Sequence, residues 1–211
     1  EAKPADVDEC MMACLTGLGV TRISLGGQSF HPRKLQLLER DHSPDEFLRA
    51  VTLAQQAGLS VAIDLIFATP GETLAEWIAD VRSAIELKPD HISTYGLTIE
   101  RGTQFFNRVH RGELIELPDQ LQGALYEHAI DTLAAAGYEH YEVSNFAQPG
   151  QRSRHNQVYW CGEGYYAAGP GAARYVGGVR ETNHRSTTTY LKRVLAGESP
   201  VAEREQLTPE Q

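Results

Sequence analysis

The chain of 211 residues is long enough to bury a hydrophobic core, and 41% hydrophobic with 22% charged residues is typical of globular proteins. Its formal net charge of −9 argues against a surface for nucleic acid or anionic membranes, which would need clustered lysine and arginine. The longest apolar run is too short to span a membrane, no signal peptide is recognisable, and three cysteines do not make a disulfide framework, so we expect a cytoplasmic protein.

The two ends of the chain suggest an internal piece of a longer protein. The chain starts with Glu1 rather than methionine, and residues 207–211 resemble the beginning of another helix. We therefore expect further chain on both sides.

The predicted elements alternate between amphipathic helices that stop near a glycine or proline and β-rich runs that follow at once. Helices are expected at about 6–19, 43–58, 73–87 and 118–136, and strands at 20–25, 61–67, 92–97 and 138–143. Ser43 with Glu46 and Thr73 with Glu76 have the spacing of capping boxes.

This alternation predicts an α/β fold with a parallel sheet covered by helices. The regular units favour a partial TIM-type (β/α) barrel over residues 1–147, since a complete barrel takes about 250 residues. A doubly wound sheet remains the alternative, because alternation alone does not separate the two. Residues 148–211 are predicted to begin a truncated, loop-rich C-terminal extension with one short helix at 187–196.

Asp64 is the first chemical anomaly, because it interrupts the apolar strand 61–67. Burying an unpaired carboxylate is costly, so Asp64 should meet either a structural partner or a ligand at the carboxyl end of its strand.

The segment 26–30 follows the first strand, and Arg40 is expected to end the next short helix. Gly26 and Gly27 would let the backbone approach a ligand, and Gln28 offers both a donor and an acceptor. Taken alone, the segment is better explained as a tight turn between strand and helix, and Arg40 as a solvated charge. Residues 69–73 are expected to form a structural turn.

The segment 152–160 is the second anomaly, with His155, Tyr159, Trp160 and two arginines within nine residues. Imidazole is a common axial ligand of heme iron, and aromatic rings can lie against a flat macrocycle. If the segment is helical, His155 and Tyr159 share one face. The structural alternative is a capping histidine in a loop anchored by aromatic side chains.

Cys10 and Cys14 have the spacing of the first two cysteines in a C-x3-C-x2-C loop, but position 17, where the third cysteine would stand, is glycine. We expect both to be ordinary helix residues, and Cys161 likewise. The first helix should then have an apolar face made of Val7, Met11, Cys14, Leu15 and Leu18.

Together, these segments resemble the oxygen-independent coproporphyrinogen III oxidase-like group of the radical S-adenosylmethionine family. The resemblance to its barrel is carried by Glu1–Pro4, Arg22–Phe30, Ile63–Thr73 and His91–Thr103. The segments 141–147 and 153–160 are similar to its heme chaperone branch.

The resemblance implies two ligand sites. Glu1, Gln28, Arg40 and Asp64 would line the S-adenosylmethionine site. His155 would be the heme iron ligand, with Tyr159 and Trp160 also at the heme. The family's [4Fe–4S] cluster would need a cysteine loop upstream of Glu1, which this chain lacks.

Three departures from the family pattern stand out. Gly27 occupies a position where valine is usual, Ala68-Thr69 replaces a Gly-Leu-like pair, and Ala173-Arg174 stands where His-Ser is frequent.

The function implied by this resemblance is binding of heme and its delivery to apo-heme proteins, with no nucleic-acid partner and membrane contact only through an acceptor. The alternative is an oxidase that decarboxylates two propionates of coproporphyrinogen III, as a radical oxidoreductase. A related radical enzyme acting on another substrate is the third possibility.

Overall fold

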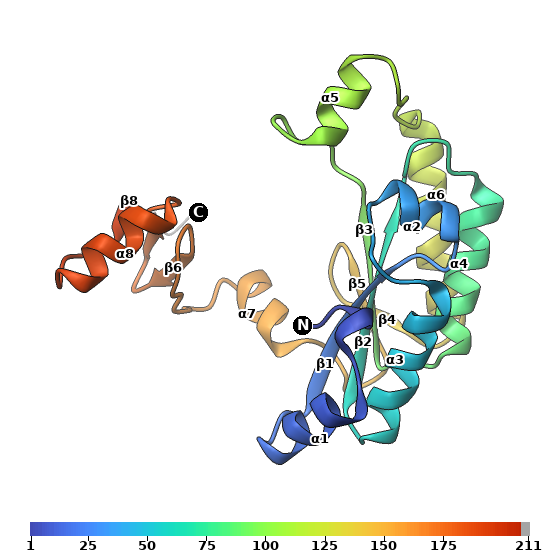
Figure 1. The fold of residues 1–211 in the computed structure, drawn as a ribbon, viewed down its shortest axis with the longest axis horizontal. Coiled ribbons are helices and arrows are strands. Elements are labelled where there is room, and N and C mark those ends of the chain that lie inside the picture. Colours follow the sequence, from blue (N-terminus) through green and yellow to red (C-terminus); the bar gives the residue numbers. More distant parts are fainter. Residues whose placement is uncertain (208–211) are drawn as a thin grey trace. The chain divides into compact units, whose positions relative to one another are not determined.

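The computed structural model describes residues 1–207 and divides the chain into two compact units, the first ending at Arg152 and the second beginning at Ser153 (Figure 1). The helix predicted to begin at 207–211 lies outside the described residues, apart from Leu207. None of the helices in residues 1–207 combines the length and apolarity that a membrane-crossing segment needs.

The first unit contains a five-stranded sheet in the order β1-β2-β3-β5-β4. The strands β1 (Arg22–Gln28), β2 (Ser60–Phe67) and β3 (His91–Gly96) are parallel, as predicted. Ile23, Leu25, Ile63 and Ile92 point from these strands into the buried core.

The fourth strand is where the sequence-based expectation was wrong. Instead of one parallel strand over 138–143, the chain forms β4 (Glu139–His140), bends at 142–144 and returns as β5 (Asn145–Ala147). The strand β5 pairs antiparallel with both β3 and β4. Because of this bend, β5 rather than β4 lies next to β3, and it runs in the opposite direction.

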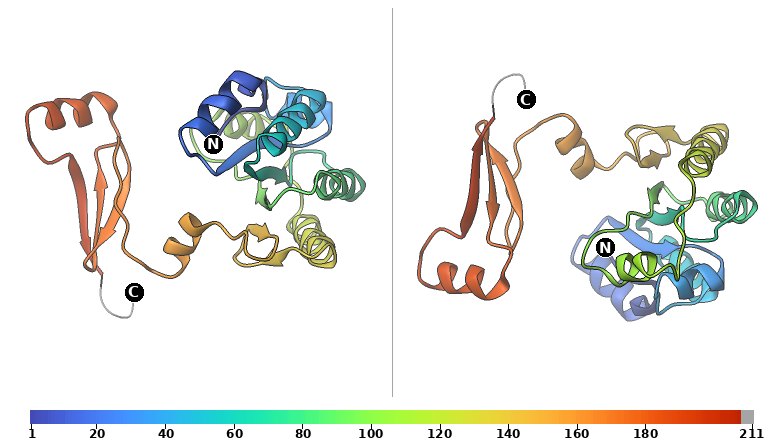
Figure 2. Two further views of the ribbon diagram at one scale, coloured as in Figure 1. Left: turned by 90° about the horizontal axis from the view of Figure 1, so that it is seen from below. Right: turned by 90° about the horizontal axis from the view of Figure 1, so that it is seen from above.

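The helices α3 (Pro44–Gln56), α4 (Leu74–Glu86) and α6 (Asp119–Ala135) pack against the same face of this sheet (Figures 1 and 2). Their Phe47, Trp77 and Leu125 are completely buried against the strands. Helices on one face favour the barrel-type arrangement over the doubly wound sheet, which carries helices on both faces.

Local capping chemistry sets where two of these helices begin. Ser43 and Glu46 form both hydrogen bonds of a capping box at α3, and Thr73 and Glu76 do the same at α4. Both predicted capping boxes are confirmed.

The shorter helices of this unit are η1 (Pro4–Asp6), α1 (Glu9–Gly17), α2 (Pro32–Leu37) and α5 (Gln104–His110). The predicted apolar face of the first helix is partly wrong, because Met12 is its buried residue while Cys14 and Leu18 are exposed. The helix begins at its Asp8 cap and packs beside α3, so only a narrow side faces the core.

The second unit contains α7 (Arg154–Trp160), α8 (Thr187–Leu195) and an antiparallel sheet of β6 (Ala173–Val176), β7 (Val179–Asn183) and β8 (Val201–Gln206). The helix predicted at 187–196 is confirmed, whereas α7 and the β6–β7 hairpin lie in the stretch expected to be loop-rich.

The predicted domain boundary at 147/148 falls slightly before the division at 152/153. Residues 148–152 stay with the first unit because the Gln148 amide donates to the Asp90 carbonyl (2.9 Å) and Arg22 donates to the Gln151 carbonyl (2.9 Å).

Candidate functional site

The sheet face opposite the helices carries a row of polar side chains. Successive side chains of a strand alternate between the two faces, and paired residues share a face. Asp64 of β2 pairs with Ser93 of β3, which in turn pairs with Asn145 of β5. Ser24 of β1 joins this row through its hydrogen bond to Asp64.

Asp64 meets hydroxyl groups rather than a basic side chain. The Ser24 hydroxyl donates to Asp64 Oδ2 at 3.1 Å, and Ser93 forms a second hydrogen bond with the carboxyl group. Burial nevertheless raises the pKa of Asp64, and the negative charge of Glu1 adds to this rise. Among the ion pairs of residues 1–207, none includes Asp64, so its charge is not compensated by a basic side chain.

Three of the four residues predicted for S-adenosylmethionine line one cavity of about 390 Å³, namely Glu1, Gln28 and Arg40. Asp64 is not among the lining residues, but it precedes Leu65, which pairs with Gln28 across β1 and β2. A cavity of this size is within the range of small-molecule sites, and its donors, acceptors and guanidinium fit a polar ligand with a carboxylate. Arg40 does not end the short helix as expected, because α2 stops at Leu37 and Arg40 follows the turn at residues 38 and 39.

The glycines before Gln28 accommodate the protein's own side chains. A Cβ atom on Gly27 would lie 2.1 Å from the Phe47 ring, and one on Gly26 would lie 2.8 Å from Gln28 Nε2. The valine usual at position 27 would therefore collide with Phe47. Gln28 itself has a φ of +64°, a left-handed conformation that is uncommon for residues other than glycine.

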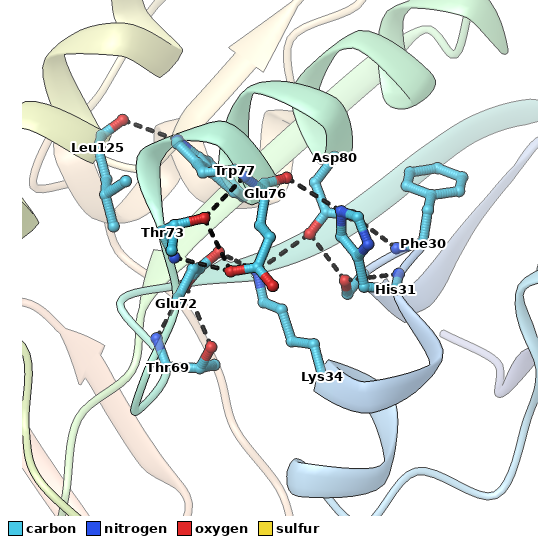
Figure 3. A network of polar contacts seen from close by, with 11 residues as sticks. Phe30, His31, Lys34, Thr69, Glu72, Thr73, Glu76, Trp77, Asp80 and Leu125 are labelled. Carbon is cyan, nitrogen blue, oxygen red and sulfur yellow. Dashed lines mark hydrogen bonds and ion pairs between the residues drawn. The ribbon is translucent and has the colours of Figure 1, made fainter.

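A buried ionic network that contacts the segment directly after Gln28 was not anticipated from the sequence. Lys34 Nζ lies 2.5 Å from Glu72 Oε1 and 3.0 Å from Asp80 Oδ2 (Figure 3). All three residues are buried, and Asp80 is fully so. The available signal was that Asp80 shares the spacing of the buried face of α4 with Trp77, Val81 and Ala84.

The predicted structural turn at 69–73 is part of this network. Glu72 Oε2 accepts hydrogen bonds from the Thr69 amide (2.9 Å) and the Thr69 hydroxyl (3.2 Å). The turn therefore connects the end of β2 to the buried charges.

The predicted heme residues lie on α7 in the second unit. His155 and Tyr159 are in ring contact with centroids 4.9 Å apart, as expected for neighbours on one helical face. Tyr159 also packs edge-on against Tyr165, at 4.5 Å. His155, Tyr159 and Trp160 are all exposed, and Trp160 is 60% exposed.

The alternative role of His155 as a helix cap is wrong, because the Ser153 side chain caps α7 through the Asn156 amide. This leaves the exposed imidazole available for a ligand.

The three cysteines are exposed, and Cys14 is not part of an apolar face. Within residues 1–207, no group of three or more histidine, cysteine, aspartate or glutamate side chains is arranged to hold a metal ion. The described residues therefore do not fit a [4Fe–4S] cluster.

Comparison with known proteins shows which proteins this chain is similar to. Residues 2–84 match the family model of the radical SAM superfamily. The chain is 42% identical over 209 residues to heme chaperone HemW of Mycobacterium tuberculosis, covering 98% of this chain and 53% of that protein. It is 32% identical over 212 residues to heme chaperone HemW of Bacillus subtilis, and this match covers 100% of this chain and 56% of that protein.

Among solved structures, the coproporphyrinogen III oxidase HemN of Escherichia coli, described as a radical SAM enzyme, superposes with a TM-score of 0.81 at 19% identity. The match covers 98% of this chain and 50% of that chain, and it confirms the predicted partial-barrel fold. The chain spans about half the length of the curated relatives that it matches.

Proposed function

Because this chain belongs to the radical S-adenosylmethionine superfamily and is HemW-like, we propose that its protein binds heme and delivers it to apo-heme proteins. The observation that carries this proposal is the exposed group His155, Tyr159 and Trp160 on α7. We further propose that the protein is cytoplasmic and does not bind nucleic acid. In this proposal it contacts membranes only through an acceptor protein.

In this proposal, heme is the cargo and His155 is its iron ligand. The edge-on contact with Tyr159 restricts the imidazole, which favours one orientation for coordination. Trp160 is sufficiently exposed to lie against an apolar macrocycle.

The cavity of the first unit is proposed to bind S-adenosylmethionine. The Arg40 guanidinium suits the methionyl carboxylate, and the Gln28 amide suits a group that both donates and accepts. The carboxylates of Glu1 and Asp64 suit amino and ribose hydroxyl donors. A hydrogen-bond donor of the ligand at Asp64 would compensate the buried negative charge, which no basic side chain of the described residues does.

The radical SAM family implies a [4Fe–4S] cluster, which supplies the electron for reductive chemistry on S-adenosylmethionine. Its cysteine ligands are proposed to lie outside residues 1–207, because the described residues hold no such group. The residues of this chain would then bind and orient the small molecule.

Heme titration of the intact protein, followed at the Soret band, tests the heme site. We expect His155→Ala to weaken heme binding roughly tenfold or more, because the substitution removes both the iron ligand and its contact with Tyr159. His110→Ala, which removes an exposed histidine of α5, is the matched control and should bind like the native protein. Equal affinities of all three proteins would remove His155 from the site.

A second assay separates the chaperone from the oxidase alternative. The intact protein, with its cluster reconstituted, is supplied with coproporphyrinogen III and S-adenosylmethionine, and protoporphyrinogen is measured. Absence of protoporphyrinogen supports the chaperone proposal, whereas robust turnover would establish the oxidase instead.

A further inference from the structure

The buried network of Lys34, Glu72 and Asp80 connects three segments of the first unit. Asp80 comes from α4, Lys34 from α2, and Glu72 from the turn after β2 (Figure 3). Asp80 Oδ1 accepts a hydrogen bond from the Phe30 amide at 2.7 Å, and its Oδ2 accepts one from the Ser29 hydroxyl at 2.7 Å. The network thus fixes Ser29 and Phe30, the two residues that directly follow β1.

Two strained backbone positions lie beside the residues that this network holds. Gln28 and Ala68 have φ values of +64° and +63°, although neither is glycine. Ser29, which bonds to Asp80, directly follows Gln28, and Thr69, which bonds to Glu72, directly follows Ala68. Such conformations persist only where the surrounding contacts impose them.

Stability alone is a poor explanation for this arrangement. Taking charged groups out of water carries a large desolvation penalty, and well-packed apolar residues often replace a buried ionic network without loss of stability. What apolar residues would not supply is two acceptor oxygens that fix the Ser29 side chain and the Phe30 backbone at once.

We propose that Asp80 is a positioning residue for S-adenosylmethionine binding, acting through Ser29 and Phe30 to hold Gln28 at the rim of the cavity. Asp80 is fully buried and is not among the residues that line this cavity, so it acts through the segment 28–30. The inference rests on the proposed cofactor site and assigns a specific role to the buried network that holds the segment after Gln28.

The test is a double-mutant cycle on the intact protein, with S-adenosylmethionine affinity measured by equilibrium dialysis. Gln28→Ala first tests the cavity itself and should weaken binding. Asp80→Asn keeps the side-chain shape and one acceptor but removes the acceptor shared by Ser29 and Lys34, and it should weaken binding roughly tenfold. The double variant should bind about as weakly as Gln28→Ala, because Asp80 acts through Gln28.

Tyr138→Phe is the matched control for loss of a buried hydrogen bond in the same unit. It removes the bond from Tyr138 to the Pro89 carbonyl (2.8 Å), which lies away from segment 28–30. This variant should retain native affinity even though its unfolding midpoint falls.

The outcomes separate the inference from the proposed function. If the native protein does not bind S-adenosylmethionine, or if Gln28→Ala binds normally, the proposed cofactor site is wrong and the inference falls with it. If Gln28→Ala weakens binding but Asp80→Asn does not, or if their effects multiply in the double variant, the positioning role is overturned and the site stands.

Discussion

At the scale of single residues, Asp64 is a buried carboxyl group that no basic side chain neutralises among the described residues. Desolvation by burial raises the pKa of its carboxyl group, and the hydrogen bonds from Ser24 and Ser93, which act in the opposite direction, do not outweigh this effect. The strand pattern predicted that the residue needs a partner. Which partners it meets depends on two other strands, and therefore on the sheet register.

Asp64→Asn should stabilise the protein when S-adenosylmethionine is absent. A carboxyl group with a raised folded-state pKa destabilises the fold when it is ionised, and this cost disappears as the pH falls towards the unfolded value. The gain should be on the order of 1 kcal/mol near pH 7 and should shrink towards pH 4. Urea unfolding at both pH values measures it.

The matched control for this prediction is Asp41→Asn. The hydrogen bond from Lys3 lowers the pKa of the Asp41 carboxyl group, so its removal should not stabilise the fold. A loss of stability in Asp64→Asn at neutral pH would contradict the argument.

Ala68 carries the second residue-scale prediction, because its φ of +63° is one that glycine adopts at little cost. Ala68→Gly should be at least about 1 kcal/mol more stable than Ala62→Gly, which makes the same chemical change in a buried β2 residue without a positive φ. Comparing the two unfolding midpoints cancels the effect of glycine on the unfolded chain. Equal midpoints would show that position 68 stores no strain.

At the scale of elements, local signals predicted the helices better than the strands. The caps Ser43 and Thr73 are confirmed because the capping bonds join residues only three apart. The antiparallel strand β5 was missed, since its place beside β3 depends on pairing between residues more than fifty positions apart. Asp80 was missed for the same reason, because its partners Ser29 and Lys34 come from other elements.

His91 connects β3 to the segment that leads into β5, through a 2.8 Å contact between its Nε2 and the Tyr141 hydroxyl. Burial, with a further contribution from the Arg22 charge, lowers the pKa of His91 to about 3. The folded protein therefore holds a neutral imidazole that the unfolded chain protonates below its ordinary pKa of 6.5.

We expect acid to destabilise the protein between about pH 6.5 and 3, with His91 contributing up to about 1.4 kcal/mol per pH unit. In His91→Gln this part of the pH dependence should disappear. His110→Gln, which removes an exposed histidine, should keep the native slope. Unfolding midpoints measured across this range decide the matter, and an unchanged slope in His91→Gln would refute the assignment.

At the scale of the whole molecule, the two proposed ligand sites lie in separate compact units. Gln28→Ala should weaken S-adenosylmethionine binding and leave heme affinity unchanged, and His155→Ala should do the reverse. Each affinity of the double variant should match that of the relevant single variant, as for independent sites. A cross-effect larger than about threefold would mean that the sites are coupled.

The sequence by itself determined the helices α3, α4, α6 and α8, the caps at Ser43 and Thr73, the three parallel strands and the resemblance to the family, because these follow from periodicity, short-range bonds and contiguous motifs. Only the tertiary structure decided the direction of β5, the row of Ser24, Asp64 and Ser93, and the burial of Asp80 against Lys34. These features join residues far apart in the chain, so their energies depend on strand register and helix packing. Strand register and helix packing are not specified by any local sequence pattern.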